Sequence, residues 1–377
     1  MGKIIPVTLL TGYLGSGKTT LLNHVLNNQK GYKVAVIVND IGEVNIDASL
    51  IQNGGVVNQT DDSLVPLQNG CICCTLKVDL MKQIVDIAKT GKFDYILIEA
   101  SGICEPIPIA QTITAISSDA ASYGLPEICR LDNIVSVVDS LRLATEFGCG
   151  ENLEKEVDDE DIENLIIQQI EFCNLIVLNK VDEIKPEQLE VVKAVIRKLQ
   201  PKAEIIETNY GKVDIGRILD TKAFNLEEVA SSAGWLQELE NEEEEEHHHE
   251  EGETEEYGIG TFVYYKRAPF NRIKFEDFAK NFPKDTVIRC KGILWFSNEP
   301  EIGYVFEQAG SQIQAYESGN WIASAPRHER KQILKENPDI ARDWDEVYGD
   351  RMIKLVFIGK DMDKQKIINQ LDDCLDV

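Results

Sequence analysis

The stretch GYLGSGKT, residues 12–19, follows the apolar run IIPVTLLT at 4–11 and leads into residues 17–28, which have helical spacing. It matches G-x-x-x-x-G-K-[ST], in which glycines allow a tight loop whose amide groups surround a phosphate. In such a loop the lysine reaches the β- and γ-phosphates and the hydroxyl binds Mg²⁺. The strand before the motif and the helix after it are the context that it requires. The motif residues are Gly12, Gly17, Lys18 and Thr19.

Apolar runs alternate with amphipathic stretches up to about residue 207. The runs are rich in Val, Ile and Leu without polar alternation, as in parallel strands that are covered on both faces. The predicted strands are 4–11, 33–39, 94–100, 133–139, 175–180 and 203–208, and the predicted helices are 17–28, 78–90, 163–172 and 186–199. The alternation predicts an α/β domain with a doubly wound, mostly parallel sheet.

The composition changes after this region. The segment LENEEEEEHHHEEGETEEYG, 239–258, has too few apolar residues to offset the entropy of ordering, which predicts a linker. Strands and helices then alternate irregularly, as in a smaller α+β domain with helices on one face of its sheet. Its predicted strands are 258–265, 287–296, 303–307, 312–316 and 352–359, and its predicted helices 274–281, 327–337 and 364–375. The expected organisation is a domain at 1–225, a linker at 226–257 and a domain at 258–377.

The charge of the chain argues against polyanionic partners. The net charge is −27, and residues 237–256 supply 12 of the 65 acidic residues. Such a chain repels nucleic acid, whereas cations are favoured. No run of 18 apolar residues occurs, so we expect no membrane span and a cytoplasmic location. Thiols stay reduced there, and clustered cysteines then indicate metal binding or catalysis more often than disulfides.

A strand-end carboxylate is predicted to serve the metal side of the nucleotide. The run ILIEASG, 96–102, places Glu99 at the carboxyl end of a buried strand and Gly102 three residues later. Mg²⁺ and its water ligands need a negative group at such a position beside the phosphate loop. The amide group of Gly102 is in a position to reach a γ-phosphate.

The run VLNKVD, 177–182, indicates which base is bound. Asp182, just past a strand, can accept hydrogen bonds from both N1–H and the exocyclic amine of guanine, which adenine cannot offer. Asn179 would brace the loop, and the alkyl part of Lys180 would cover the base. The loop TNYG, 208–211, is expected to lie against the base as well.

Three cysteines occur within four positions in LQNGCICCTL, 67–76: Cys71, Cys73 and Cys74. A disulfide between the adjacent Cys73 and Cys74 is disfavoured, because neighbouring cysteines bridge only with strain. Two alternatives to metal binding remain: a redox pair of Cys71 and Cys74, and simple filling of the core. Thiolates this close can share a cation, most commonly zinc, but a tetrahedral site needs a fourth ligand. The candidates are carboxylates in VNDIGEVNID, 38–47, on a loop expected near the γ-phosphate: Asp40, Glu43 and Asp47.

Taken together and in this order, GYLGSGKT, NDIGEVNID, LQNGCICCTL, IEASGICEP and NKVD resemble the CobW-like family of metal-handling GTPases. The resemblance covers about 4–215 densely and extends to RCKGILWF, 289–296, and KLVFIGKDMD, 354–363. It implies slow GTP hydrolysis, with GTP and Mg²⁺ at the phosphate loop, coupled to delivery of a metal from the cysteine motif to a client protein. Zinc is preferred from the thiolates, with cobalt and iron as alternatives.

The resemblance also implies residue roles. Lys18, Thr19 and Glu99 are expected to be catalytic. The expected nucleotide-binding residues are Gly12, Gly15, Ser16, Gly17, Lys18, Thr19, Thr20, Gly102, Asn179, Lys180 and Asp182; the expected metal ligands are Cys71, Cys73, Cys74, Glu43 and Asp40. The family often has Glu where this chain has Asp40, whose carboxylate has a shorter reach. Two alternative functions stay open: a regulatory or assembly GTPase with a structural zinc, and a P-loop kinase or small-molecule transferase. The histidine tract at 247–249 either captures metal or is only part of a solvated linker.

Overall fold

The computed structural model describes residues 4–27, 31–38, 64–66, 76–122, 127–148, 162–236, 256–310, 312–337, 340–341 and 344–376. The chain divides into two compact units, Met1–Ala233 and Gly234–Val377. The domain limits expected from the sequence remain predictions. Within the described ranges, no helix combines the length and apolar character needed to cross a bilayer.

The N-terminal unit is built on a seven-stranded sheet in the order β3-β2-β4-β1-β5-β6-β7, in which every pair of neighbours is parallel. The strands are β1 (Ile5–Thr11), β2 (Val34–Val38), β3 (Leu64–Pro66), β4 (Tyr95–Glu99), β5 (Cys129–Asp139), β6 (Leu175–Asn179) and β7 (Glu204–Thr208). The predicted doubly wound α/β class is thereby confirmed. Because β1 is central, the loop after it lies where the strand order reverses, the usual place for a ligand in such sheets.

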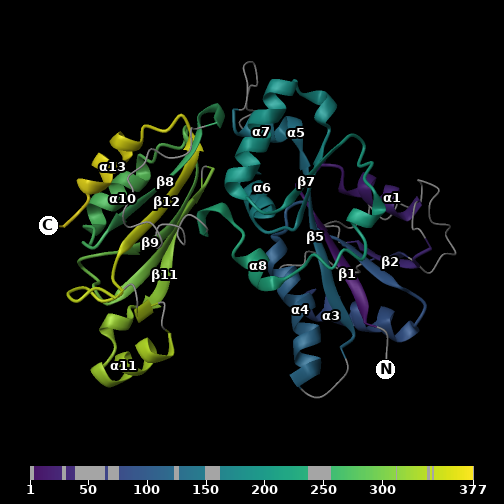
Figure 1. The fold of residues 1–377 in the computed structure, drawn as a ribbon, viewed down its shortest axis with the longest axis horizontal. Helices are drawn as coiled ribbons and strands as arrows, with labels where there is room; N and C mark the ends of the chain where they lie inside the picture. Colours follow the sequence, from purple (N-terminus) through teal and green to yellow (C-terminus); the bar gives the residue numbers. More distant parts are fainter. Residues whose placement is uncertain are drawn as a thin grey trace. The chain divides into compact units, whose positions relative to one another are not determined.

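Helices cover both faces of this sheet (Figure 1). They are α1 (Lys18–Asn27), α3 (Leu76–Thr90), α4 (Pro106–Ser122), α5 (Ser140–Glu146), α6 (Ile162–Glu171), α7 (Pro186–Leu199) and the short α8 (Leu226–Ala230). The connection through α1 runs from β1 towards the β3 end of the sheet, and the connections through α3, α4, α6 and α7 all run in the opposite direction. Right-handed crossovers therefore put α1 on one face and the other four on the opposite face.

Strands inside the sheet are fully buried, which explains their unbroken apolar runs. The expectation that 203–208 is a buried strand was wrong. Most of β7 is half-buried or exposed, because it is an edge strand that pairs only with β6. The glutamates Glu204 and Glu207 fit that position, since edge strands favour charged side chains.

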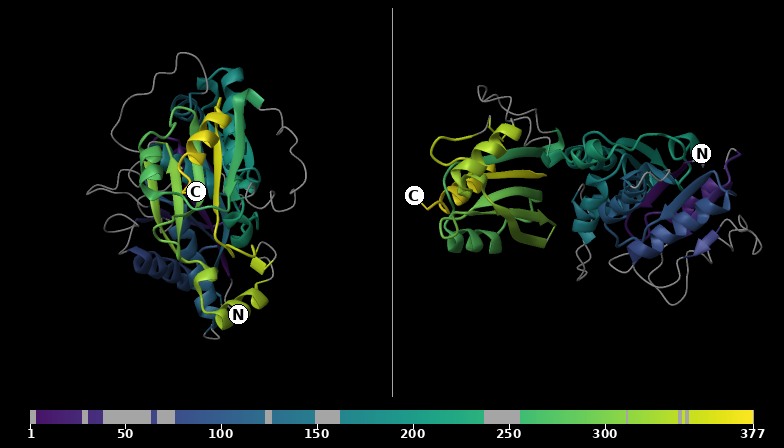
Figure 2. Two further views of the ribbon diagram at one scale, coloured as in Figure 1. Left: turned by 90° about the vertical axis from the view of Figure 1, so that its left-hand side faces the viewer. Right: turned by 90° about the horizontal axis from the view of Figure 1, so that it is seen from below.

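The C-terminal unit is a five-stranded antiparallel sheet in the order β11-β10-β9-β12-β8, which confirms the predicted α+β class. Its strands are β8 (Ile259–Lys266), β9 (Val287–Trp295), β10 (Ile302–Ala309), β11 (Gln312–Asn320) and β12 (Ile353–Lys360). The helices α10 (Arg272–Lys280) and α13 (Lys364–Asp372) pack on one face over an aromatic core. The helix α11 (Arg327–Glu336) instead lies beyond the end of the sheet, near β11 (Figures 1 and 2).

A buried polar network crosses the N-terminal unit. Tyr95 on β4 donates a hydrogen bond from its hydroxyl to Asp132 Oδ2 on β5 at 2.5 Å, and the same hydroxyl is 2.8 Å from Thr8 Oγ1. Asp132 also accepts bonds from the backbone amides of Thr221 and Lys222 and from Arg130. Burial acts to raise the pKa of Asp132, but these hydrogen bonds outweigh burial and hold the pKa below its ordinary value. The network thus fastens the chain after residue 219 to the sheet.

Replacing Tyr95 by Phe should lower the free energy of unfolding by about 1–3 kcal/mol, since it removes one of the hydrogen-bond donors to a buried carboxylate. The variant should also lose stability at a higher pH on acidification. A carboxyl group whose pKa is depressed by folding stabilises the protein above its unfolded pKa, and Tyr95→Phe moves the folded pKa of Asp132 upward. Urea unfolding between pH 3 and 7 measures both effects.

The matched control is Tyr32→Phe, because the Tyr32 ring packs edge-on against Tyr95 at 6.1 Å but no hydrogen bond of its hydroxyl is found in the described structure. Equal stability losses for the two variants would contradict a special role for the Tyr95 hydroxyl.

Candidate nucleotide and metal site

The loop between β1 and α1 has a backbone that only glycine accommodates. Gly12 and Gly17 have φ of 136° and 105°, in the left-handed region that favours glycine. A Cβ on Gly12 would lie 2.2 Å from the carbonyl oxygen of Val137, and one on Gly17 would lie 2.3 Å from Asn179 Nδ2. The two glycines therefore let β5 and the end of β6 approach the loop closely. Gly15 also has positive φ, at 75°.

Lys18 closes this loop from inside. Its side chain is buried, and Nζ donates hydrogen bonds to the carbonyl oxygens of Gly12 at 2.7 Å and Tyr13 at 3.2 Å. An ammonium group held this way puts positive charge at the mouth of the loop, where the N-terminus of α1 adds to it. The neighbouring Ser16 is buried, whereas Thr20 is exposed on the first turn of α1.

Thr19 and Glu99, expected on the metal side, are in direct contact. Thr19 Oγ1 donates a hydrogen bond to Glu99 Oε1 at 3.0 Å, and Glu99, the last residue of β4, is 1% exposed. The strand register explains the contact, because Glu99 pairs with Leu10 near the end of β1. A hydroxyl and a buried carboxylate form an all-oxygen donor set, which fits Mg²⁺.

The loop after β4 lies against the phosphate loop. A Cβ on Gly102 would fall 2.6 Å from the backbone nitrogen of Leu14, so only glycine allows this approach. Gln169 on α6 holds the loop there, since its Nε2 donates to the carbonyl oxygens of Gly102 at 3.1 Å and Cys104 at 3.2 Å. Gln169 was not predicted as a site residue from the sequence. The only indication in the sequence was a polar amide side chain at an otherwise apolar position of the predicted helix at 163–172.

Asn179 joins the base loop to the phosphate loop. Its Nδ2 donates to the carbonyl oxygen of Ser16 at 2.9 Å, and its Oδ1 accepts from the amide of Gly211 at 3.2 Å. Its own carbonyl oxygen accepts from Ser140 Oγ at 2.7 Å. The side chain is 2% exposed. Asn179 therefore fixes three loops at the carboxyl edge of the sheet.

In the described structure, Lys180 and Asp182, the other two residues of the base motif, do not contact the phosphate loop as Asn179 does. Lys180 has a φ of 61° and forms an ion pair with Asp139, the N-cap of α5. Asp182 is exposed, and its backbone amide donates to Asn209 Oδ1 at 3.1 Å. Residues 208–211 are thus adjacent to the base motif, as expected if both contact one ligand.

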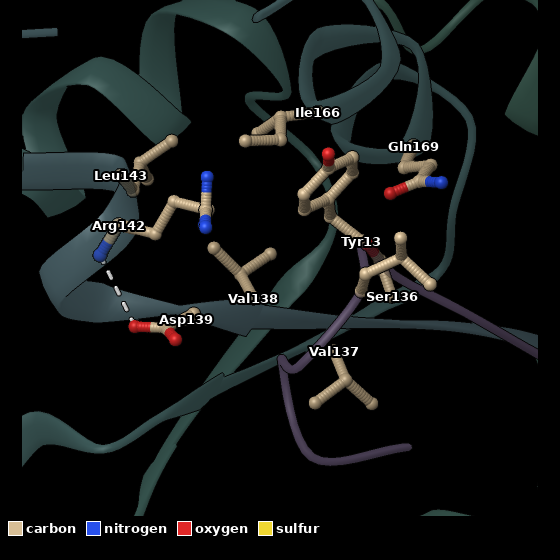
Figure 3. Close-up of a pocket in the computed structure, with 10 residues that line it drawn as sticks. Tyr13, Ser136, Val137, Val138, Asp139, Arg142, Leu143, Ile166 and Gln169 are labelled. Atoms are coloured by element: carbon tan, nitrogen blue, oxygen red, sulfur yellow. Dashed lines mark hydrogen bonds between the residues drawn. The ribbon is translucent and has the colours of Figure 1, made fainter. Parts of the chain in front are cut away.

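A small pocket lies beside the phosphate loop, with Tyr13 and Leu14 from the loop on one wall and α5 and α6 on the other (Figure 3). The guanidinium of Arg142 is 5.1 Å from the centre of the Tyr13 ring. The cavity volume is about 10 Å³, room for roughly one water molecule. This pocket is too small for a nucleotide, and it connects the loop to Gln169 and Asp139.

The predicted metal ligands lie outside the described residues: Asp40, Glu43, Cys71, Cys73 and Cys74, as do Asp47 and His247–His249. The ends of the neighbouring strands are described. In the sheet register, Val38 at the end of β2 pairs with both Glu99 and Pro66, the ends of β4 and β3. In the sequence, Asp40 follows the end of β2 and Cys71 follows the end of β3, and β2 lies beside β4, which ends at Glu99.

The described cysteines are unsuited to metal binding. All five are buried: Cys104, Cys129, Cys173, Cys290 and Cys374. Burial raises the pKa of the thiols of Cys173 and Cys290, and raises that of Cys374 to about 11. Among the residues that the structure describes, no three His, Cys, Asp or Glu side chains converge as a metal site would require.

Each of the two units matches a known protein family. The family model "CobW/HypB/UreG, nucleotide-binding domain" matches residues 6–207, and that of the cobalamin synthesis protein CobW C-terminal domain matches residues 259–375. The zinc-regulated GTPase metalloprotein activator 1 of Dictyostelium discoideum is 36% identical over 98% of this chain and 80% of its own length. The zinc chaperone CobW of a Sinorhizobium species is 29% identical over 88% and 93%. The zinc chaperone YjiA of Escherichia coli is 29% identical over 78% and 83%.

Replacing Asn179 by Ala should lower guanine nucleotide affinity at least about tenfold and reduce the melting temperature, because a buried carbonyl and a buried amide lose their partners. Asn179→Asp keeps the acceptor for Gly211, but it replaces the donor to Ser16 with a buried carboxylate oxygen that faces a carbonyl oxygen, so its loss of affinity should be at least as large. Titration with a fluorescent guanine nucleotide and thermal unfolding measure the two effects. Unchanged affinity in the Ala variant would show that the bracing is dispensable.

Proposed function

This chain belongs to the CobW/HypB/UreG family of nucleotide-binding proteins, and we propose that it is a GTP-dependent zinc metallochaperone. In this proposal, a zinc ion is held by Cys71, Cys73 and Cys74 with a carboxylate from Glu43 or Asp40 as fourth ligand. Hydrolysis of GTP releases the ion to a client metalloprotein. The P-loop GTPase character is that of the family; the zinc cargo and its transfer are inferred for this chain.

One observation carries the proposal. The ends of β2, β3 and β4 are neighbours at the sheet edge that holds the phosphate loop. Asp40 follows Val38, the end of β2, by two residues in the sequence. The thiol stretch is bounded by Pro66 and Leu76. In this proposal, a terminal phosphate near Gly102 and a metal held by these segments would act on neighbouring parts of the chain, as in nucleotide switches.

The residues at the phosphate loop support binding and charge stabilisation. Lys18 and the N-terminus of α1 would face the β- and γ-phosphates of a bound nucleotide, where negative charge accumulates as the terminal phosphate is transferred. Thr19 and Glu99 would hold Mg²⁺, which neutralises phosphate charge when it is bound. Gly102, fixed by Gln169, presents its backbone close to the loop. Asp182, exposed beside Asn209, is free to bind the guanine edge.

Replacing Asp182 by Asn should weaken GTP binding about 100-fold, because two hydrogen bonds to a charged acceptor are lost. The variant should bind xanthosine triphosphate better than the parent protein does, since Asn offers a donor to the extra carbonyl of that base. Competition titrations with GTP, ATP and xanthosine triphosphate measure the change. Glu183→Gln, an adjacent exposed acid, is the control and should leave base preference unaltered. Unchanged preference in Asp182→Asn would point to a kinase or transferase that does not select guanine.

Replacing Cys71, Cys73 and Cys74 together by Ser should abolish zinc binding and any stimulation of GTP hydrolysis by zinc, while GTP affinity and the melting temperature stay near those of the parent. Cys374→Ser is the control, because its buried thiol donates to the carbonyl oxygen of Gln370 and serine can do the same. Mass spectrometry of the bound ion and phosphate release with and without zinc give the answer. Unfolding of the triple variant would instead assign the zinc a structural role.

A further inference from the structure

A second pocket lies wholly within the C-terminal unit, between α11 and the turn at 344–351. Its cavity volume is about 230 Å³, large enough for several ligand atoms or an amino-acid side chain. One wall is a single face of α11, formed by residues at positions i, i+3, i+4 and i+7: Arg327, Arg330, Lys331 and Leu334. That face presents three cations in a chain whose net charge is −27.

Among the described residues, the two acids in the lining, Asp345 and Glu346, form no ion pair with these cations. Asp345 is directed at its own turn, where its Oδ1 accepts from the amides of Val347 and Tyr348 at 2.7 Å each. These bonds lower the pKa of Asp345, so it stays ionised but engaged. Glu346 is the other acid in the lining, and it is exposed without a cation partner in the described residues.

Two of the cations have no side-chain partner among the residues that the structure describes. Arg330 is engaged, since its guanidinium lies 5.9 Å from the centre of the Trp344 ring and bonds the carbonyl oxygen of Ala323. Arg327 and Lys331 are exposed, and neither has an ion pair or hydrogen bond from its side chain to another described residue. They are one helical turn apart, a spacing that suits two carboxylates of one extended segment.

The pocket also has an apolar part. Val347 is 79% exposed, although it stands on a turn that hydrogen bonds hold in place, and Leu334 and Trp344 line the same cavity. A purely ionic ligand would leave these groups in water. The lining is therefore complementary to a ligand that carries both carboxylates and an apolar side chain.

We propose that this pocket binds an acidic segment of a partner protein, with carboxylates at Arg327 and Lys331 and an apolar side chain against Val347. Nucleic acid is the poorer fit, because a long polyanion extends beyond the local cations into the field of a strongly acidic molecule. A short segment feels mainly the nearest charges, since screening acts over about 8 Å at physiological salt. The proposal goes beyond the nucleotide and zinc chemistry and does not require either.

The test uses the full-length protein and a fluorescein-labelled peptide of Asp and Glu residues around a central Phe, followed by fluorescence anisotropy at physiological salt. Lys331→Glu should weaken binding about tenfold, because one attractive pair becomes repulsive. Lys335→Glu makes the same charge change one turn along the same helix, outside the pocket lining, and should change affinity less than about threefold. Val347→Ser, or Ser in place of the peptide Phe, should each weaken binding, and the two changes together should add little to either alone.

Equal losses in Lys331→Glu and Lys335→Glu would overturn the proposal, since the peptide would then sense only net charge. Failure of the parent protein to bind the peptide would overturn it as well. Tighter binding of an oligouridylate or of vesicles containing phosphatidylserine than of the peptide would assign the pocket to another class of partner. Circular dichroism melts confirm that the exposed substitutions leave the fold intact.

Discussion

The arrangement of the nucleotide site depends on the two hydrogen bonds of Asn179. The residue ends the buried strand β6, and its side chain reaches back to Ser16 and across to Gly211. The phosphate loop and the base loop come from distant parts of the sequence, and this amide sets the spacing between them. Gly17 must lack a side chain for the amide to fit. A buried amide that is bonded at both its nitrogen and its oxygen is costly to misplace, so it defines one geometry for the loops at the carboxyl ends of the strands.

The carboxyl ends of β4, β2 and β3, in the other half of the sheet, lie on the same side as this loop contact. Glu99, at the end of β4, contacts Thr19 on one side and pairs in register with Val38 on the other. The chain towards the three clustered cysteines begins one strand further, at Pro66. Events at a terminal phosphate and at a bound zinc ion would then act on adjacent segments. That proximity gives the proposed coupling a physical route that needs no long-range pathway.

The sequence predicted the central strands and the phosphate loop well, because burial on both faces demands the apolar runs that were visible in it. It did not predict α4, whose β-branched residues favour helix poorly; packing against the sheet decides its structure. The edge position of β7 was also missed, because it depends on pairing rather than on local composition. Gln169 and the Tyr95–Asp132 network were invisible for a related reason, since their partners are 37 or more residues away in sequence.

The proposed coupling makes zinc affinity depend on the bound nucleotide, through the segments that follow the carboxyl ends of β2, β3 and β4. The most direct measurement is the zinc affinity of the protein loaded with a non-hydrolysable GTP analogue and then with GDP, by competition with a chromophoric chelator. Coupling between sites usually changes affinity about 5–150-fold, and a difference in that range is what the arrangement of Glu99, Val38 and Pro66 predicts. Equal zinc affinities in the two nucleotide states would contradict it.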